Sequence, residues 1–255
     1  MATDTSLRVQ YLLRLADTCL VHAQRLSEWC GHAPIVEEDI ALANIALDLL
    51  GQARALLAHA GQVEGRGRDE DALAFLREER DYLNVTMAEL PRGDFAFTVL
   101  RVAMLATLFE LLWQRLADAS ADAELAAIAA KAVKEARYHR RHAGDWVVRL
   151  ADGTAESRQR SERALAELWL YAAEWFEPCD AVDDAAAASG LGPRWADLEA
   201  PWRQAMSELL AEAGLAQPAD AAFRSGGRNG RHSEHMGRLL AEMQYLQRAY
   251  PGGVW

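Results

Sequence analysis

The sequence predicts an all-α protein made of long helices, and three observations carry this prediction. Ala and Leu dominate the apolar residues while Ile and Val are scarce, so that intrinsic preference favours helix over strand. The apolar residues recur at the three- and four-residue spacings of a helix face. The prolines lie between these periodic blocks, where a missing amide donor marks a helix boundary. They stand at positions 34, 91, 178, 193, 201, 218 and 251.

The first two helices are defined by their ends. A helix over residues 6–29 is followed by Gly31 and Pro34, which stop it. Its apolar stripe is formed by Leu12, Leu15, Cys19, Ala23 and Leu26. A second helix over residues 37–61 begins with acidic residues, which suit the positive end of a helix dipole.

Further helices follow the same pattern of periodic blocks and breaks. They are predicted over residues 71–90, 94–117, 122–150, 155–176 and 233–250. Asp94 supplies an N-cap for the second of these. Between residues 179 and 233, short helices are broken by Gly190, Pro193 and Pro201, and a loop surrounds the glycines near residue 228. We expect a single helical domain over 1–255, with a core over 36–177 and a C-terminal helical extension over 178–255.

The composition is that of a globular protein. With 255 residues, 51% of them hydrophobic and 25% charged, the chain is long enough to bury a core and too apolar to be mostly disordered. Its formal net charge of −11 makes it a poor binder of nucleic acid and of anionic lipid. We therefore expect neither partner.

The cysteines and the apolar runs indicate the compartment. Cys19, Cys30 and Cys179 are odd in number and far apart, which favours neither a disulfide framework nor a thiolate zinc site. Arg14 and Asp17 interrupt the N-terminal apolar run, and no uncharged segment approaches the roughly 20 residues that a bilayer crossing needs. We expect a cytoplasmic protein without a membrane partner.

Polar side chains are embedded in the two most apolar helices. Residues 40–60 are apolar nearly all round, which predicts a helix buried in the middle of a bundle. Asn44, Asp48 and Gln52 nevertheless share one face of it, since they are four residues apart. In the helix over 94–117, the embedded polar residues are Thr107, Glu110 and Gln114. The pattern predicts two buried carboxylates, Asp48 and Glu110.

A buried carboxylate needs a partner, because leaving an ionised group unpaired inside a protein is costly. Three partners are open: an arginine or lysine, a shared proton, or hydrogen bonds to Tyr82 and Tyr138. We favour the ion pair. The basic candidates on neighbouring helices, most of which we expect on solvated faces, are Arg77, Arg80, Lys131, Lys134, Arg137 and Arg140.

Long helices with inward carboxylates are the plan of ferritin-like di-iron proteins, in which two helices each carry Glu-x-x-His. None of the seven histidines has an acidic residue three positions before it, so the motif is absent from this sequence. Glu-x-x-Tyr stands in its place at Glu79 and at Glu135, although a further copy at Glu242 lowers the specificity of the pattern. The candidates for a lost metal site are Asp48, Glu79, Tyr82, Glu110, Glu135, Tyr138 and His139.

A glycine-rich turn near the C-terminus reverses the local sign of charge. Residues 226–230 precede a helix, and no acidic residue lies between Ala221 and Ser233. Such turns suit phosphate groups, so a coenzyme A tail or an acidic partner could bind here, and a plain solvent loop is the alternative. The residues proposed for this contact are Arg224, Arg228 and Arg231.

Five ordered segments make the chain recognisable. They are LADTCLV (15–21), EWCGHAP (28–34), ALANIALDLLGQAR (41–54), KEARYH (134–139) and AEMQYLQR (241–248). These segments closely resemble the second ferritin-like subunit, of the PaaC type, in bacterial 1,2-phenylacetyl-CoA epoxidases. The resemblance extends over nearly the whole chain and implies a ferritin-like four-helix bundle core with additional N- and C-terminal helices.

The resemblance implies a place in a multicomponent monooxygenase of aerobic phenylacetate breakdown. A sister ferritin-like subunit would hold the di-iron centre and epoxidise the CoA-linked ring, while a reductase with flavin and an iron–sulfur cluster would use NADPH. This chain would be the structural partner of that catalytic subunit, with no catalytic residue and no bound cofactor. It would help to build the acyl-CoA pocket and dock a small third subunit and the reductase, and its tryptophans suit such an interface or a core equally.

Two other functions stay open from the residues alone. The chain could be a di-iron oxygenase with an unusual ligand set drawn from Asp48, Glu79, Glu110, Glu135 and His139. It could instead store or oxidise iron, which requires a complete ferroxidase centre. The missing Glu-x-x-His motif disfavours both.

Overall fold

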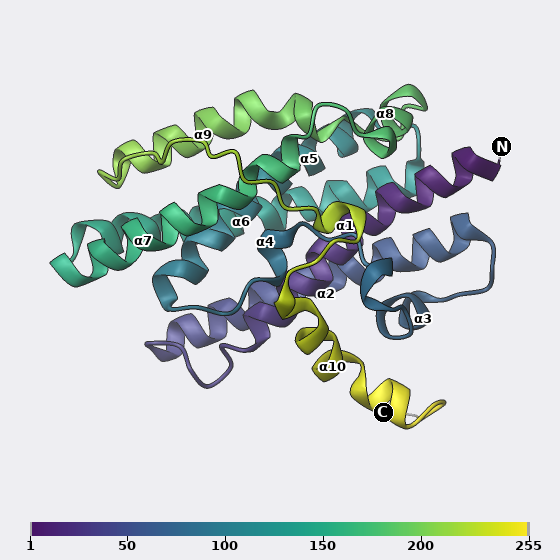
Figure 1. The fold of residues 1–255 in the computed structure, drawn as a ribbon, viewed down its shortest axis with the longest axis horizontal. Helices are drawn as coiled ribbons and strands as arrows, with labels where there is room; N and C mark the ends of the chain where they lie inside the picture. Colours follow the sequence, from purple (N-terminus) through teal and green to yellow (C-terminus); the bar gives the residue numbers. More distant parts are fainter. Residues whose placement is uncertain (1, 254–255) are drawn as a thin grey trace. The chain divides into compact units, whose positions relative to one another are not determined.

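The computed structural model describes residues 2–253, with side chains from Ser6 onward, and within this part of the chain the fold is all-α (Figure 1). Ten α-helices and four short 3₁₀-helices are present in the described residues, and no strand. An isolated bridge joins Gly226 and Arg231. The predicted fold class, all-α and consistent with a ferritin-like bundle, is confirmed.

The chain divides into two compact units. Unit 1 consists of Met1–Pro91 and Ser225–Trp255, and unit 2 consists of Arg92–Arg224. The segment predicted as one C-terminal extension, 178–255, is therefore shared between the two units. The C-terminal helix packs with the N-terminal part of the chain.

Unit 1 is built on a pair of long helices, α1 and α2, which pack side by side (Figure 1). Its elements are α1 (Ala2–Ser27), α2 (Val36–Glu64), α3 (Glu70–Phe75), η1 (Glu79–Asp81), α4 (Thr86–Glu89), η4 (Gly227–Asn229) and α10 (Glu234–Ala249). Gly65 ends α2 in the left-handed conformation that glycine adopts most easily. The Ser233 side chain caps α10.

The continuous helix predicted over 71–90 is wrong, because this segment is broken twice. The backbone is extended at Glu78, between α3 and η1, and again from Tyr82 to Val85, between η1 and α4, so that only short helical pieces remain. The reason lies in the side chains: Arg77 is turned into the core, while Glu78 and Asp81 form a reciprocal capping box that begins a new, separate turn at η1. The periodic spacing of apolar residues does not predict these side-chain contacts.

The expectation that α2 is buried all round is also wrong. One face packs inward through residues such as Leu42, Ile45 and Leu49, whereas Leu47 is 64% exposed. Asn44 is exposed as well. By length and composition alone both α2 and α5 (Phe95–Ala119) could cross a bilayer, but 83% of the apolar window of α5 is buried in the protein, against 44% for α2.

A buried ion pair ties α1 to the irregular segment after α3. The Arg77 guanidinium pairs with the Asp17 carboxylate, and both side chains are almost wholly buried. Asp17 also accepts a hydrogen bond from the Leu83 amide at 2.8 Å. Arg77 lies over the Tyr82 ring, 4.2 Å from its centroid. Each charge is therefore compensated, as a buried pair requires.

A second buried carboxylate, that of Glu89, binds the segment that leads into the C-terminal helix α10. Glu89 accepts a hydrogen bond from His232 Nδ1 at 2.7 Å and one from Asn84 at 2.9 Å. The other ring nitrogen of His232 lies 2.9 Å from the Tyr82 carbonyl oxygen, so both nitrogens face acceptors. Burial lowers the pKa of His232, but the hydrogen bond and charge of Glu89 outweigh it and raise the pKa above its ordinary value. Charged imidazolium fits this site.

Unit 2 is centred on α5 and α6, which pack along their lengths. Its elements are α5 (Phe95–Ala119), α6 (Ala123–Asp152), α7 (Ala155–Ala172), η2 (Ala173–Phe176), α8 (Ala181–Ala188), η3 (Trp195–Leu198) and α9 (Glu199–Glu212). Asp94 caps α5 through the Phe97 amide, as predicted. Trp175, Trp195 and Trp202 have no exposed area, so these tryptophans pack the core.

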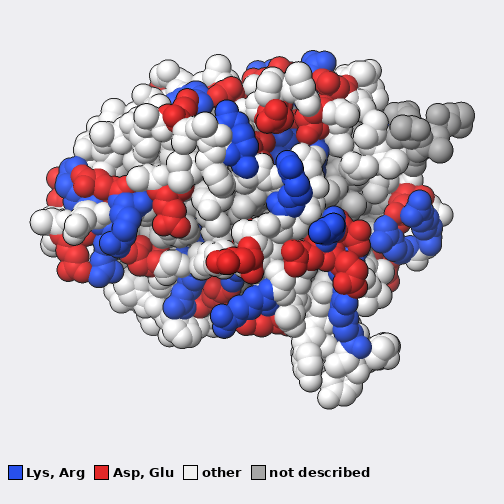
Figure 2. Space-filling model, in the orientation of Figure 1, with Lys and Arg blue, Asp and Glu red and all other residues white. Residues whose placement is uncertain are grey.

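The charged surface is mixed in sign. On the face drawn in Figure 2, Lys and Arg side chains alternate with Asp and Glu side chains, and neither sign forms a continuous field. The net charge of −11 is therefore not concentrated on this face.

Replacing Arg77 with Met should lower the free energy of unfolding by about 3–5 kcal/mol, because Asp17 would be left as an unpaired buried charge. Chemical denaturation measures this loss. The double variant Asp17→Leu, Arg77→Met should lose much less. The control Arg54→Met, which breaks the exposed pair of Arg54 with Glu70, should cost less than about 1 kcal/mol. A double variant less stable than Arg77→Met would contradict this account.

The ion pair of His232 predicts a pH-dependent stability. A raised folded-state pKa gives a stabilisation that is complete below the unfolded value of about 6.5 and is lost as pH rises through the folded value. The advantage of the wild type over His232→Gln, measured by urea denaturation, should therefore shrink toward alkaline pH. An advantage that grows with pH would show that His232 is neutral in the folded protein.

Candidate functional site

The inward carboxylate of α5 is held by arginines of α6. Glu110 Oε1 lies 3.0 Å from Arg137 Nε, and its Oε2 lies 2.5 Å from Arg140 Nε. The Glu110 side chain is 17% exposed, so Glu110 is half-buried rather than fully buried as predicted, and both arginines reach the surface. Both oxygens that could bind a metal are thus engaged by guanidinium groups, the ion pair favoured from the sequence.

The other candidates on α6 are divided between the interior and the surface. Glu135 lies 3.4 Å from Lys131 Nζ, and His139 is buried. Tyr138 is 45% exposed and stacks on His142, with the ring centroids 5.9 Å apart. The Tyr138 side chain therefore lies at the surface rather than beside a buried carboxylate.

The candidates in unit 1 do not share a helix face. Glu79 is exposed in η1, whereas Tyr82 is fully buried beyond the end of that turn. The Tyr82 hydroxyl donates to the Ala74 carbonyl oxygen and accepts from Gln244, and burial raises the pKa of Tyr82 to about 12. Asp48 is half-buried in α2 rather than fully buried as predicted. The breaks after α3 remove the helical register that the Glu-x-x-Tyr pattern assumed.

The residues present do not fit the di-iron centre that a ferritin-like fold implies. Among the described residues, no three His, Cys, Asp or Glu side chains are grouped so as to hold a metal ion. A di-iron site of this class uses four carboxylates and two histidines from facing helices. Here Glu110 is already neutralised by Arg137 and Arg140.

The glycine-rich turn is a packed structural element. Arg14 of α1 donates to the Arg228 carbonyl oxygen at 3.1 Å, and the Gly227 amide donates to Thr86 Oγ1 at 3.1 Å. A Cβ on Gly227 would lie 2.4 Å from the Asn84 carbonyl oxygen, so only glycine fits. The Arg228 side chain is 2% exposed. The predicted contact of Arg228 with a coenzyme A phosphate or partner is therefore wrong, while Arg231 is exposed.

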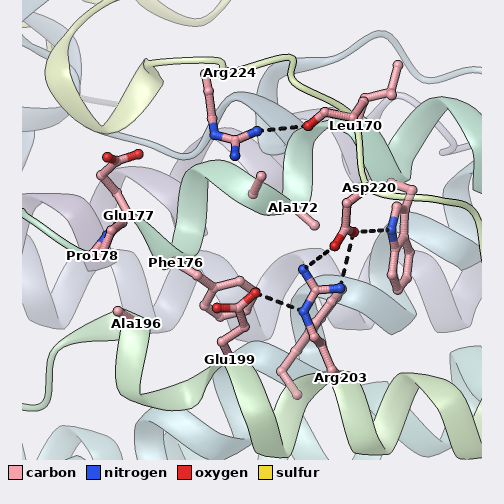
Figure 3. A pocket seen from close by; sticks show the side chains of 14 residues that line it. Leu170, Ala172, Phe176, Glu177, Pro178, Ala196, Glu199, Arg203, Asp220 and Arg224 are labelled. Atoms are coloured by element: carbon pink, nitrogen blue, oxygen red, sulfur yellow. Dashed lines mark hydrogen bonds and ion pairs between the residues drawn. The ribbon is translucent and has the colours of Figure 1, made fainter.

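A cavity of about 620 Å³ lies in unit 2 between α7, η2, α9 and the segment after α9 (Figure 3). Arg224 and Arg203 lie on its wall, as do the rings of Phe176 and Trp202. Sequence reasoning named Arg224 but not Arg203 or Asp220. Little in the sequence indicates that Arg203 and Asp220 form a pair, because they are 17 positions apart and one lies in a helix and the other in a loop.

The charges around this cavity largely compensate one another. Arg203 Nε lies 2.8 Å from Glu199 and its Nη2 lies 3.1 Å from Asp220, which also accepts from Trp169 Nε1 at 3.1 Å. The hydrogen bond from Arg203 lowers the pKa of Asp220 below its ordinary value. Arg224 donates to the carbonyl oxygens of Ala221 and Phe223. The cavity is thus built from internal ion pairs and aromatic packing.

The fold and these sites define a helical protein of the ferritin-like class whose inward carboxylate is paired with arginine. The chain belongs to the family of phenylacetic acid catabolic proteins, which it matches over residues 1–255. It is 48% identical to one of the subunits of the 1,2-phenylacetyl-CoA epoxidase of Escherichia coli (strain K12) over 245 residues, which cover 96% of this chain and 98% of that protein. The family resemblance found in the sequence is confirmed.

Replacing Glu110 with Gln should lower the free energy of unfolding by only about 1 kcal/mol, because both arginines can turn to solvent. This is less than the loss expected for a fully buried pair. Urea denaturation measures it, with Glu156→Gln, which breaks the exposed pair of Glu156 with Arg160, as the control. A loss of about 3 kcal/mol or more for Glu110→Gln would show that the arginines cannot be rehydrated.

Proposed function

We propose that this chain is the non-catalytic structural subunit of a 1,2-phenylacetyl-CoA epoxidase and supports a separate di-iron subunit. The 48% identity to the Escherichia coli epoxidase subunit, which extends over 96% of this chain, supports a role in such a complex. The pairing of Glu110 with Arg137 and Arg140 is the single observation that carries the non-catalytic role. This pairing leaves the Glu110 carboxylate without a free oxygen for iron.

In this proposal the redox chemistry belongs to other chains. The catalytic ferritin-like subunit holds the irons, and a reductase with flavin and an iron–sulfur cluster delivers electrons from NADPH. The complex also includes a small third subunit and works in the cytoplasm. This chain contributes folded surface, and any contact with phenylacetyl-CoA uses side chains other than the buried Arg228.

The alternative, an active di-iron oxygenase with an unusual ligand set, is supported less well. It would have to release Glu110 from two arginines and bring it together with His139 and carboxylates such as Glu135. An iron-storage role meets the same difficulty, because a ferroxidase centre also needs unpaired carboxylates.

Metal analysis and turnover test the proposal. This chain is purified alone and together with the di-iron subunit, and iron and epoxidation of phenylacetyl-CoA are measured in each preparation. We expect iron and turnover only when the di-iron subunit is present, and higher turnover with this chain than without it. Iron bound by this chain alone, with turnover, would overturn the proposal.

A variant of Glu110 tests separately whether this residue takes part in catalysis. In the complex, Glu110→Gln should change kcat by less than about twofold, because Glu110 touches no reacting atom. Loss of a carboxylate that took part in acid–base or metal chemistry would cost about 10²-fold or more. A loss of that size would assign Glu110 to the catalytic machinery.

A further inference from the structure

The outer face of α2 carries an apolar stripe that the protein leaves uncovered. Its residues repeat at alternating four- and three-residue steps, the spacing of a helix–helix seam. They are Val36 (70% exposed), Ile40 (58%), Ala43, Leu47 (64%) and Leu50 (42%). We refer to these residues as the α2 seam. A contiguous apolar stripe that is exposed in this way marks an interaction site.

The α2 seam is separate from the face that holds α2 in place. The inward face carries Leu42, Ile45, Leu49 and Leu56, which are buried. At 100° per residue these lie on the opposite side of the helix from the seam. The helix therefore has two apolar faces, and only one is satisfied within the chain.

Small residues make the α2 seam suitable for another helix. Ala43 sits in the middle of the stripe, and Gly51 lies beside Leu50 with no atom near the place of a Cβ. Such positions let a second helix backbone approach closely. The stripe from Val36 to Leu50 is about 21 Å long, enough for several turns of a partner helix.

The charges at the two ends of the α2 seam discriminate between occupants. Glu37 and Asp39 flank its N-terminal end, and at its other end Arg54 is already paired with Glu70 at 3.1 Å. The surroundings are therefore net negative. A second copy of this chain, with a net charge of −11, and an anionic membrane would both meet like charge. A different protein with basic residues at one end of an apolar helix fits best.

We propose that the α2 seam is the core of the surface that binds the catalytic di-iron subunit, which presents to it a helix with an apolar stripe flanked by Lys or Arg. This inference rests on the proposed function. A stripe of about 21 Å by 10 Å is smaller than the roughly 800 Å² per partner of a stable interface. The seam is therefore the central part of a larger contact, where truncation has its greatest effect.

Binding measurements with matched variants test the seam. Leu47→Glu and Ile40→Glu place a charge on it without costing helix propensity. The control is Leu246→Glu on α10, a leucine that is 50% exposed on another helix of unit 1. In titrations against the purified di-iron subunit, each seam variant should raise Kd about tenfold or more, and Leu246→Glu should leave it unchanged. Circular dichroism and thermal unfolding confirm that each variant is folded.

A photo-crosslinking residue gives a positive readout. Benzoylphenylalanine at position 47 should crosslink to the di-iron subunit, and the same residue at position 246 should not. Glu37→Lys should weaken binding and reduce its dependence on salt, because it removes the attraction at the N-terminal end of the seam.

The outcomes separate the two proposals. If the wild-type chain fails to bind the di-iron subunit at all, the proposed function and the seam fall together. If the wild type binds and the seam variants bind equally well, the seam assignment alone is overturned. A wild-type dimer that Leu47→Glu dissociates would assign the seam to a second copy. Binding to phosphatidylcholine vesicles that Leu47→Glu abolishes would assign it to lipid, and both results overturn the proposal.

Discussion

A carboxylate turned into a protein has to be compensated, and three carboxylates here are matched by positive charges, two of them fully buried in unit 1 and the third half-buried in unit 2. Asp17 is matched by Arg77, Glu89 by His232, and Glu110 by two arginines of α6. In a di-iron protein, metal ions supply the positive charge. Here side chains supply it. A carboxylate whose two oxygens are engaged in this way has no free oxygen to offer a metal ion.

In unit 1 the same constraint explains why the chain abandons regular helix after α3. Arg77 reaches Asp17 only if the backbone after it turns away, and the extended residues that result carry carbonyl oxygens that need donors. Gln244 and Arg248 of α10 both donate to the Arg77 carbonyl oxygen, at 2.9 and 2.8 Å. The C-terminal helix thus supplies hydrogen-bond donors to the residue whose side chain pairs with Asp17 of α1. Segments far apart in sequence become interdependent through hydrogen bonds rather than through apolar area alone.

The sequence predicts those features that depend on near neighbours. Asp94 as a cap, the long helices over α5 and α6, and the ion-paired state of Glu110 follow from local spacing and from the cost of a buried charge. The break after Arg77 does not, because its cause lies 60 residues away in Asp17. Asp17 within an apolar stripe was the available signal. Likewise, periodicity identifies α2 as apolar but cannot say which face is covered, and Arg228 looks like a ligand contact until its burial is seen.

The proposed non-catalytic role rests on Arg137 and Arg140, which hold both carboxylate oxygens of Glu110. Anomalous diffraction at the iron edge, recorded from crystals of this chain in complex with the di-iron subunit, tests it most directly. We expect anomalous peaks only in the partner chain, with Arg137 and Arg140 still bound to both oxygens of Glu110. An anomalous peak at a metal ion coordinated by Glu110, with Arg137 and Arg140 displaced from that carboxylate, would contradict the proposed role.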